Sequence, residues 1–74
     1  AWYNRGFFML ERGLAEDAVD CFENAQRLGM NNAEVLEEKV RALEEVGREE
    51  EAEEVRQRAE EMREEAEQEM VEEY

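Results

Sequence analysis

The chain has 74 residues and a formal net charge of −14, and residues 33–74 carry most of that charge, with eighteen acidic and six basic side chains. Because phosphate binding requires a basic face, this composition argues against nucleic acid and against anionic membranes as partners. The length allows one domain with a modest core, no apolar stretch is long enough to span a bilayer, and no signal-peptide pattern is found.

The first two helices are expected at Ala1 to Arg12 and at Leu14 to Leu28. Gly13 and Gly29 follow them, and a glycine just after a helix takes the left-handed conformation of a C-terminal cap without strain. In the second helix apolar residues recur at spacings of three and four, which predicts one buried face. That face consists of Leu14, Ala18, Cys21, Phe22, Ala25 and Leu28.

The third helix is expected to begin with a cap and to end at Val46, before Gly47. Its predicted start is a capping box, in which Asn31 accepts a hydrogen bond from the backbone amide of Glu34 and the Glu34 side chain bonds back to the amide of Asn31. The helical spacing of its apolar residues predicts that it buries Leu36, Val40 and Leu43.

The fourth helix is expected to run from Arg48 to Tyr74, about 26 residues or roughly 39 Å, because no stop signal interrupts it. Its apolar stripe is narrow and consists of Ala52, Val55, Ala59, Met62, Ala66 and Met70. Ion pairs are expected within the helix at Glu54–Arg58, Glu53–Arg56 and Glu60–Arg63. Acidic side chains crowd the negative end of the helix dipole, so the last turns are expected to fray unless Met70, Val71 and Tyr74 pack on a partner.

The chain repeats itself with a period of 34 residues, and the turn glycines Gly13 and Gly47 mark that period. Further matching pairs include Glu11 and Glu45, Glu16 and Glu50, Ala18 and Ala52, and Ala25 and Ala59. This period predicts repeated helix-turn-helix units. We therefore expect an all-α fold, a single domain over residues 1–74, with one antiparallel hairpin in residues 1–32 and a second, with an extended last helix, in residues 33–74.

The first hairpin resembles a tetratricopeptide repeat. The family's Trp, Gly, turn Gly, Ala, aromatic and Ala positions are filled by Trp2, Gly6, Gly13, Ala18, Phe22 and Ala25. The second hairpin matches less well, because Leu36 replaces the Trp, Val40 the small Gly and Arg56 the aromatic residue. Met30 and Glu64 stand where the family has proline.

The resemblance implies helix pairs stacked into a right-handed superhelix whose concave face binds extended peptides. The positions that match that face are Tyr3, Phe7, Leu10, Glu11, Glu37, Arg41, Glu44 and Glu45. The basic and Asn groups with which some family members hold a peptide carboxylate are missing. Arg41 alone could not hold one, because acidic residues surround it. An ordinary array also needs about three repeats to bury its core, whereas this chain contains two.

The first helix is apolar around most of its circumference, which predicts burial on more than one side. Three explanations stay open. The long fourth helix covers this apolar surface, or a homodimer buries it, or it lines a peptide-binding groove. The candidate interaction surface consists of Tyr3, Phe7, Leu10 and Arg41.

No residue pattern points to chemistry. The chain has no histidine, so Cys21 lacks the base that a catalytic thiol requires, and it is expected to be a small core residue. As the only cysteine it cannot form an internal disulfide. The glutamate runs lack the Glu-x-x-His pairs of di-metal bundles and the pattern of a calcium loop, and they are interpreted as a solvated face. The sequence predicts no enzyme, no cofactor and no metal.

The chain also lacks His, Pro, Ser, Thr and Ile, and it is rich in strong helix formers. This bias is typical of a sequence assembled or optimised by design. We therefore predict a designed or engineered helical scaffold with no evolved biochemical activity, which requires no partner. The alternative is a protein-interaction module that binds a peptide or helix, or associates with itself, through the apolar face of its first helix.

Overall fold

The structure, a computed structural model, describes the backbone of residues 1–72 and the side chains of residues 1–69. It contains four helices, α1 (Trp2–Glu11), α2 (Ala15–Arg27), α3 (Ala33–Glu45) and α4 (Glu49–Glu72). The prediction of an all-α fold is confirmed, and the starts and ends of the helices agree with expectation to within one or two residues. The predicted end at Tyr74 and the expected docking of Met70, Val71 and Tyr74 lie outside the described residues.

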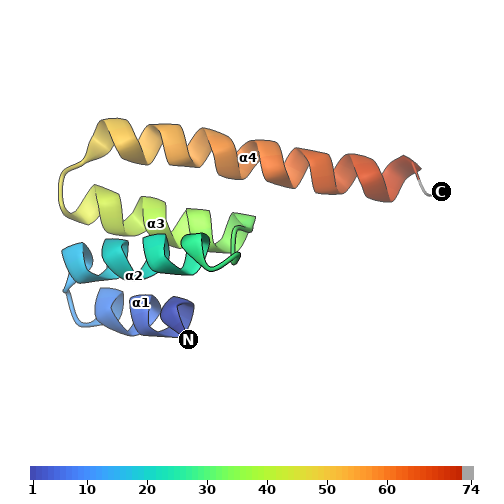
Figure 1. The fold of residues 1–74 in the computed structure, drawn as a ribbon. Coiled ribbons are helices and arrows are strands. Elements are labelled where there is room, and N and C mark those ends of the chain that lie inside the picture. The colour runs from blue at the N-terminus through green and yellow to red at the C-terminus, as the bar shows by residue number, and fades with distance from the viewer. Residues whose placement is uncertain (73–74) are drawn as a thin grey trace.

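The four helices lie side by side in one row, each antiparallel to the next (Figure 1). Within the described residues each helix packs on its neighbour, α1 also touches α3, and α4 packs on α3 alone. Of the three explanations for the apolar surface of the first helix, cover by α4 is therefore wrong. The turn after α3 places α4 on the side of α3 that faces away from α1, and its 24 residues extend past the 13 of α3 (Figure 1).

Glycine turns end α1 and α3 in the same way. Gly13 and Gly47 have φ angles of 79° and 82°, in the left-handed region where a side chain is strained. The residue after each glycine donates its backbone amide to a carbonyl five residues back, from Leu14 N to Met9 O and from Arg48 N to Leu43 O, each at 2.9 Å. These bonds satisfy carbonyl groups that the ends of the helices leave free. The two glycines thus repeat in structure as well as in sequence.

The α3 helix begins one residue later than the predicted capping box. Asn32, not Asn31, is the N-cap, and its side chain accepts a 3.0 Å hydrogen bond from the amide of Val35. The residue at the reciprocal position is therefore apolar, so no capping box forms. Asn31 instead accepts a 3.3 Å bond at the surface from the side chain of Gln26.

Replacing Asn32 with alanine is expected to lower the free energy of unfolding by about 1 kcal/mol, because the amide of Val35 loses its acceptor. The matched control is Asn31→Ala, which removes only an exposed bond and should change stability by less than about 0.5 kcal/mol. Urea unfolding followed by circular dichroism measures both. Equal losses for the two variants would contradict this assignment of the cap.

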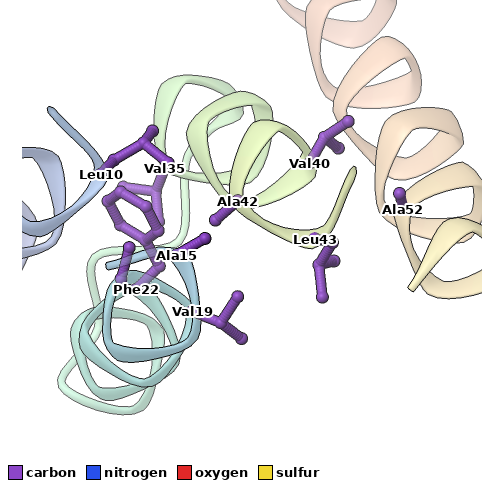
Figure 2. Close-up of a cluster of buried hydrophobic side chains, with 10 residues drawn as sticks. Leu10, Ala15, Val19, Phe22, Val35, Val40, Ala42, Leu43 and Ala52 are labelled. Carbon is purple, nitrogen blue, oxygen red and sulfur yellow. The ribbon is translucent and has the colours of Figure 1, made fainter. Parts of the chain in front are cut away.

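The core lies between α1, α2 and α3 and continues to the inner face of α4 (Figure 2). Its largest side chains without exposed surface are Phe22, Leu43, Val19 and Val35. Figure 2 shows Phe22 of α2 lying close to Leu10 of α1 and Val35 of α3. The predicted burial of Leu14 and Leu28 is wrong, since they are 45% and 72% exposed at the two ends of α2.

The two hairpins pack with different residues at the same place. In the first hairpin, a Cβ atom on Gly6 would lie 2.7 Å from the ring of Phe22, so α1 and α2 approach closely over this ring. Thirty-four residues on, the pair becomes Val40 and Arg56. Val40 is only 7% exposed, while the guanidinium of Arg56 bonds to Glu44 and Glu53 at the surface. At this place the larger buried side chain is therefore Phe22 of α2 in the first hairpin, and Val40 of α3 in the second.

Candidate interaction surface

The α1 helix exposes apolar side chains on two different sides. Phe7 is 40% exposed, and its spacing of four from Tyr3 and three from Leu10 puts it on the same side of α1 as these residues. The outer surface of α1, as we name it, consists of Trp2, Arg5, Phe8 and Arg12. Here the Arg5 guanidinium lies 5.5 Å from the Trp2 ring centroid, and that of Arg12 lies 4.7 Å from the Phe8 centroid. Both distances allow cation–π attraction, and the surface is therefore apolar and basic together.

The structure places the predicted interaction residues in three different environments. Leu10 is only 5% exposed, packed in the core, and has almost no surface to offer a partner. Tyr3 is half-buried, with its ring 6.0 Å from that of Phe22. Phe7 and Arg41 are exposed. A partner on this side would therefore meet Phe7, the edge of Tyr3 and Arg41, but not Leu10.

A small polar group lies where α1 meets α3. Burial raises the pKa of the Tyr3 hydroxyl, and the charges of Glu38 and Glu34 raise that pKa further. Glu38 has one carboxylate oxygen that is buried and accepts no hydrogen bond, with Arg41 Nη1 3.6 Å away. This oxygen is an acceptor that a donor on a bound peptide could use. No sequence pattern marked it, because Glu38 resembles its exposed neighbours in the glutamate runs.

Ion pairs join neighbouring helices at the rims of the row. The Lys39 ammonium of α3 lies 3.5 Å from Glu23 of α2 and donates a 3.0 Å bond to Gln26. Arg63 of α4 donates two hydrogen bonds to Glu37 of α3, at 2.5 and 2.6 Å. Exposed pairs of this kind contribute little to stability.

Of the three ion pairs predicted within α4, only Glu53–Arg56 forms, at 2.7 Å. Arg63 bonds to Glu37 of α3 instead of to Glu60, and Arg58 pairs with no carboxylate among the described residues. The packing of α4 on α3 brings acceptors within reach that helical spacing does not reveal. The predictions at Glu54–Arg58 and Glu60–Arg63 are therefore wrong.

Stability is expected to depend on pH through Glu37, because the bonds from Arg63 lower the pKa of this carboxyl. A lowered pKa stabilises the fold above the unfolded value of about 4.3, and that contribution is lost as the pH falls through the folded pKa. Glu37→Gln should therefore slightly lower the urea midpoint at pH 7, and its difference from the unmodified chain should disappear on acidification. The control Glu45→Gln removes an exposed carboxylate of α3 and should show no such convergence.

Cys21 is buried in α2, and this burial raises the pKa of its thiol. A higher pKa lowers the fraction of thiolate at neutral pH, and the thiolate is the nucleophilic form of cysteine. Over residues 1–69, no three acidic or cysteine side chains converge as a metal site. None of the helices in the described part of the chain is both long and apolar enough to cross a membrane.

Sequence reasoning overlooked the outer surface of α1 as a distinct site. The signal was nevertheless present, since Arg5 follows Trp2 by three residues and Arg12 follows Phe8 by four. Residues at these spacings are neighbours on one side of a helix. Periodicity counted Trp2 and Phe8 only as further apolar residues of an unusually apolar helix.

The fold and this surface define an all-α protein of stacked antiparallel helical hairpins, with a partly aromatic helix at one end of the row and a long acidic helix at the other. Comparison with known proteins yields no match, neither to a protein-family model nor to a curated protein or a solved structure.

Proposed function

We propose that the chain is a structural helical-repeat scaffold of the tetratricopeptide type, without catalytic activity. The observation that carries this proposal is that the sequence period coincides with a packing period. Ala18 and Ala25 of α2 are 0% and 3% exposed, and their counterparts in α4, Ala52 and Ala59, are 1% and 2% exposed. Small residues at these places let the two helices of each hairpin lie close together.

The exchange of Gly6 and Phe22 for Val40 and Arg56 supports the same proposal. The larger buried side chain at this place is Phe22 of α2 in the first hairpin and Val40 of α3 in the second. The tetratricopeptide pattern therefore changes at these two positions while the stacking of the hairpins is kept. A scaffold requires the stacking and does not require the residues of one particular binding groove.

The absence of catalytic activity is part of the proposal. Acid-base catalysis by a carboxyl group requires an environment that moves its pKa towards neutrality. The pKa of the Glu37 carboxyl is lowered by its hydrogen bonds from Arg63, which moves it away from neutrality. The hollow between α3 and α4, about 320 Å³, combines Arg41 and Arg56 with three glutamates around Val40 and Ala59, so its charges largely compensate one another.

We also propose that the sequence is designed or engineered. The support is compositional: His, Pro, Ser, Thr and Ile are all missing, and strong helix formers replace them. A natural relative that carries the same departures from the repeat pattern, Val40, Arg56 and Glu64, would contradict this origin. Such a relative would leave the proposed structural role intact.

The structural role is tested by thermal unfolding in the presence of candidate ligands. A ligand that binds only the folded chain stabilises it by about 2.7 kcal/mol when present at a hundred times its dissociation constant. We expect no saturable rise in the unfolding midpoint with a random peptide library, or with calcium, zinc or manganese ions. A saturable rise with one ligand would overturn the proposal.

A second candidate function is the binding of a peptide beside α1 and α3. Three features favour it: exposed Phe7, half-buried Tyr3, and the buried oxygen of Glu38 that accepts no hydrogen bond. If this candidate is correct, a peptide from the library raises the midpoint and Phe7→Ala abolishes that rise. The control Leu28→Ala removes an apolar side chain that is 72% exposed at the C-terminal end of α2 and is not part of this candidate site, so it should leave the rise unchanged.

A further inference from the structure

The internal repeat shows what kind of element fits the outer surface of α1. The residues of α3 that correspond to Arg5 and Phe8, 34 positions on, are Lys39 and Ala42. In α3 this side is covered by α2: Lys39 bonds to Gln26 and pairs with Glu23, and Ala42 has no exposed surface. The same side of the equivalent helix α1 has no cover within the described residues.

The exposed side of α4 corresponds in turn to the side of α2 that covers α3. The counterparts of Ala15, Val19, Glu23 and Gln26 are Glu49, Glu53, Gln57 and Glu60. We name these four residues the outer stripe of α4, and all of them are exposed. The stripe that carries one acidic residue in α2 therefore carries three in α4. Its charge favours a basic helix as the partner.

We propose that the outer surface of α1 in one copy of the chain receives the outer stripe of α4 from a second copy, in the register that α2 takes on α3. The Lys39–Gln26 contact then becomes a contact of Arg5 with Glu60. Val46 borders the same surface hollow as Ala15, so their counterparts Arg12 and Glu49 form a second ion pair. The exposed aromatic rings of Trp2 and Phe8 are covered between these pairs.

The distribution of charge favours this occupant over other pairings of two copies. Residues 1–32 carry five acidic and three basic side chains, whereas residues 33–74 carry eighteen and six. The contact joins the acidic half of one copy to the nearly neutral half of the other, while a contact between two α4 helices would join two acidic halves. At about 0.15 M salt the Debye length is about 8 Å, so salt screens the repulsion between distant charges more strongly than the attraction within an ion pair.

Such a contact uses two different surfaces, so it is head-to-tail and leaves one of each surface free for a further copy. Association should therefore be visible as a mass that rises with concentration. This inference and the proposed function can fail separately. A chain that stays a single copy in solution would contradict this inference, and it would leave the proposed structural role unchanged. The midpoint titrations test the proposed function, and mass measurements test this inference.

The experiment is sedimentation equilibrium at about 0.15 M salt on two charge-reversal variants, Arg5→Glu with Arg12→Glu, and Glu49→Lys with Glu60→Lys. Each should raise the dissociation constant of the contact at least tenfold. The second reduces the net negative charge, so weaker association cannot be ascribed to greater repulsion. Matched controls make equal charge changes elsewhere, at Arg27 and Arg58 or at Glu54 and Glu61, and should associate as the unmodified chain does.

The decisive sample is an equimolar mixture of the two variants. Acidic α1 of one variant then meets basic α4 of the other, and basic α1 meets acidic α4, so the mass rise should return. Circular dichroism of each variant confirms that it is folded. A mass of one chain for the unmodified protein at all concentrations, or a mixture that associates no better than its components, would overturn the inference.

Discussion

Replacing Phe22 with alanine is expected to abolish cooperative folding at room temperature. Phe22 has no exposed surface and lies in the core with Leu10 and Val35, against Gly6 and the ring of Tyr3. Truncating a buried phenylalanine costs about 3–5 kcal/mol, because the apolar contacts are lost and a cavity remains. Domains have only about 0.05–0.15 kcal/mol of stability per residue, so in a chain this short the loss is comparable to the whole.

The measurement is far-ultraviolet circular dichroism with urea titration. We expect a lower helical signal in water and no sigmoidal transition. Phe8→Ala is the matched control, since it removes the same atoms from a side chain that is 51% exposed, and it should cost less than about 0.5 kcal/mol. Similar urea midpoints for the two variants would contradict the central place of Phe22 in the core.

The positions of the helices could be predicted because local signals determine them. Gly13 and Gly47 end their helices in the left-handed conformation, which glycine adopts without strain. The start of α3 was harder, because Asn31 and Asn32 are equally good caps by type. The structure identifies Asn32 as the cap, because its backbone is extended, with φ −124° and ψ 170°, and its side chain reaches the amide of Val35.

The relative positions of the helices could not be predicted in the same way. An apolar stripe shows that α4 packs on something, but it does not distinguish α3 from α1 as the partner. The choice follows from the turn at Gly47, which leads α4 to the free side of α3. The wrong prediction of the Glu60–Arg63 pair has the same origin, since Glu37 lies within reach of Arg63 only once α3 and α4 are in contact.

The candidate surface was predicted in part. Apolar residues around most of α1 predicted burial on more than one side, whereas Trp2, Phe7 and Phe8 are 36%, 40% and 51% exposed. Within the described residues, only the side of α1 that packs on α2 and α3 is covered. Leu10 and Phe7 both fall on the concave face in the resemblance, and yet Leu10 is in the core and Phe7 is 40% exposed. The difference depends on the close packing of α1 over Phe22, which brings Leu10 against Val35 (Figure 2).

That close packing leads to the second large effect, at Gly6. In an exposed helix, replacing glycine with alanine stabilises by about 1 kcal/mol. At Gly6 we expect the opposite sign, because the new Cβ would lie 2.7, 2.9 and 3.0 Å from three ring carbons of Phe22. Overpacking of a core costs about 1–3 kcal/mol, so Gly6→Ala should lower the free energy of unfolding by up to about 2 kcal/mol once the gain in helix propensity is subtracted.

A double-mutant cycle separates this steric cost from a general defect in α1. Phe22→Leu removes part of the ring from the contact and keeps an apolar side chain, and in that background Gly6→Ala should cost less than it does in the unmodified chain. Asn4→Ala is the control for helix propensity, since Asn4 is exposed on the same helix and alanine should stabilise it slightly. Stabilisation of the unmodified chain by Gly6→Ala would show that α1 and α2 do not pack closely over the ring of Phe22. The replacement of Gly6 and Phe22 by Val40 and Arg56 in the second hairpin would then have no steric explanation.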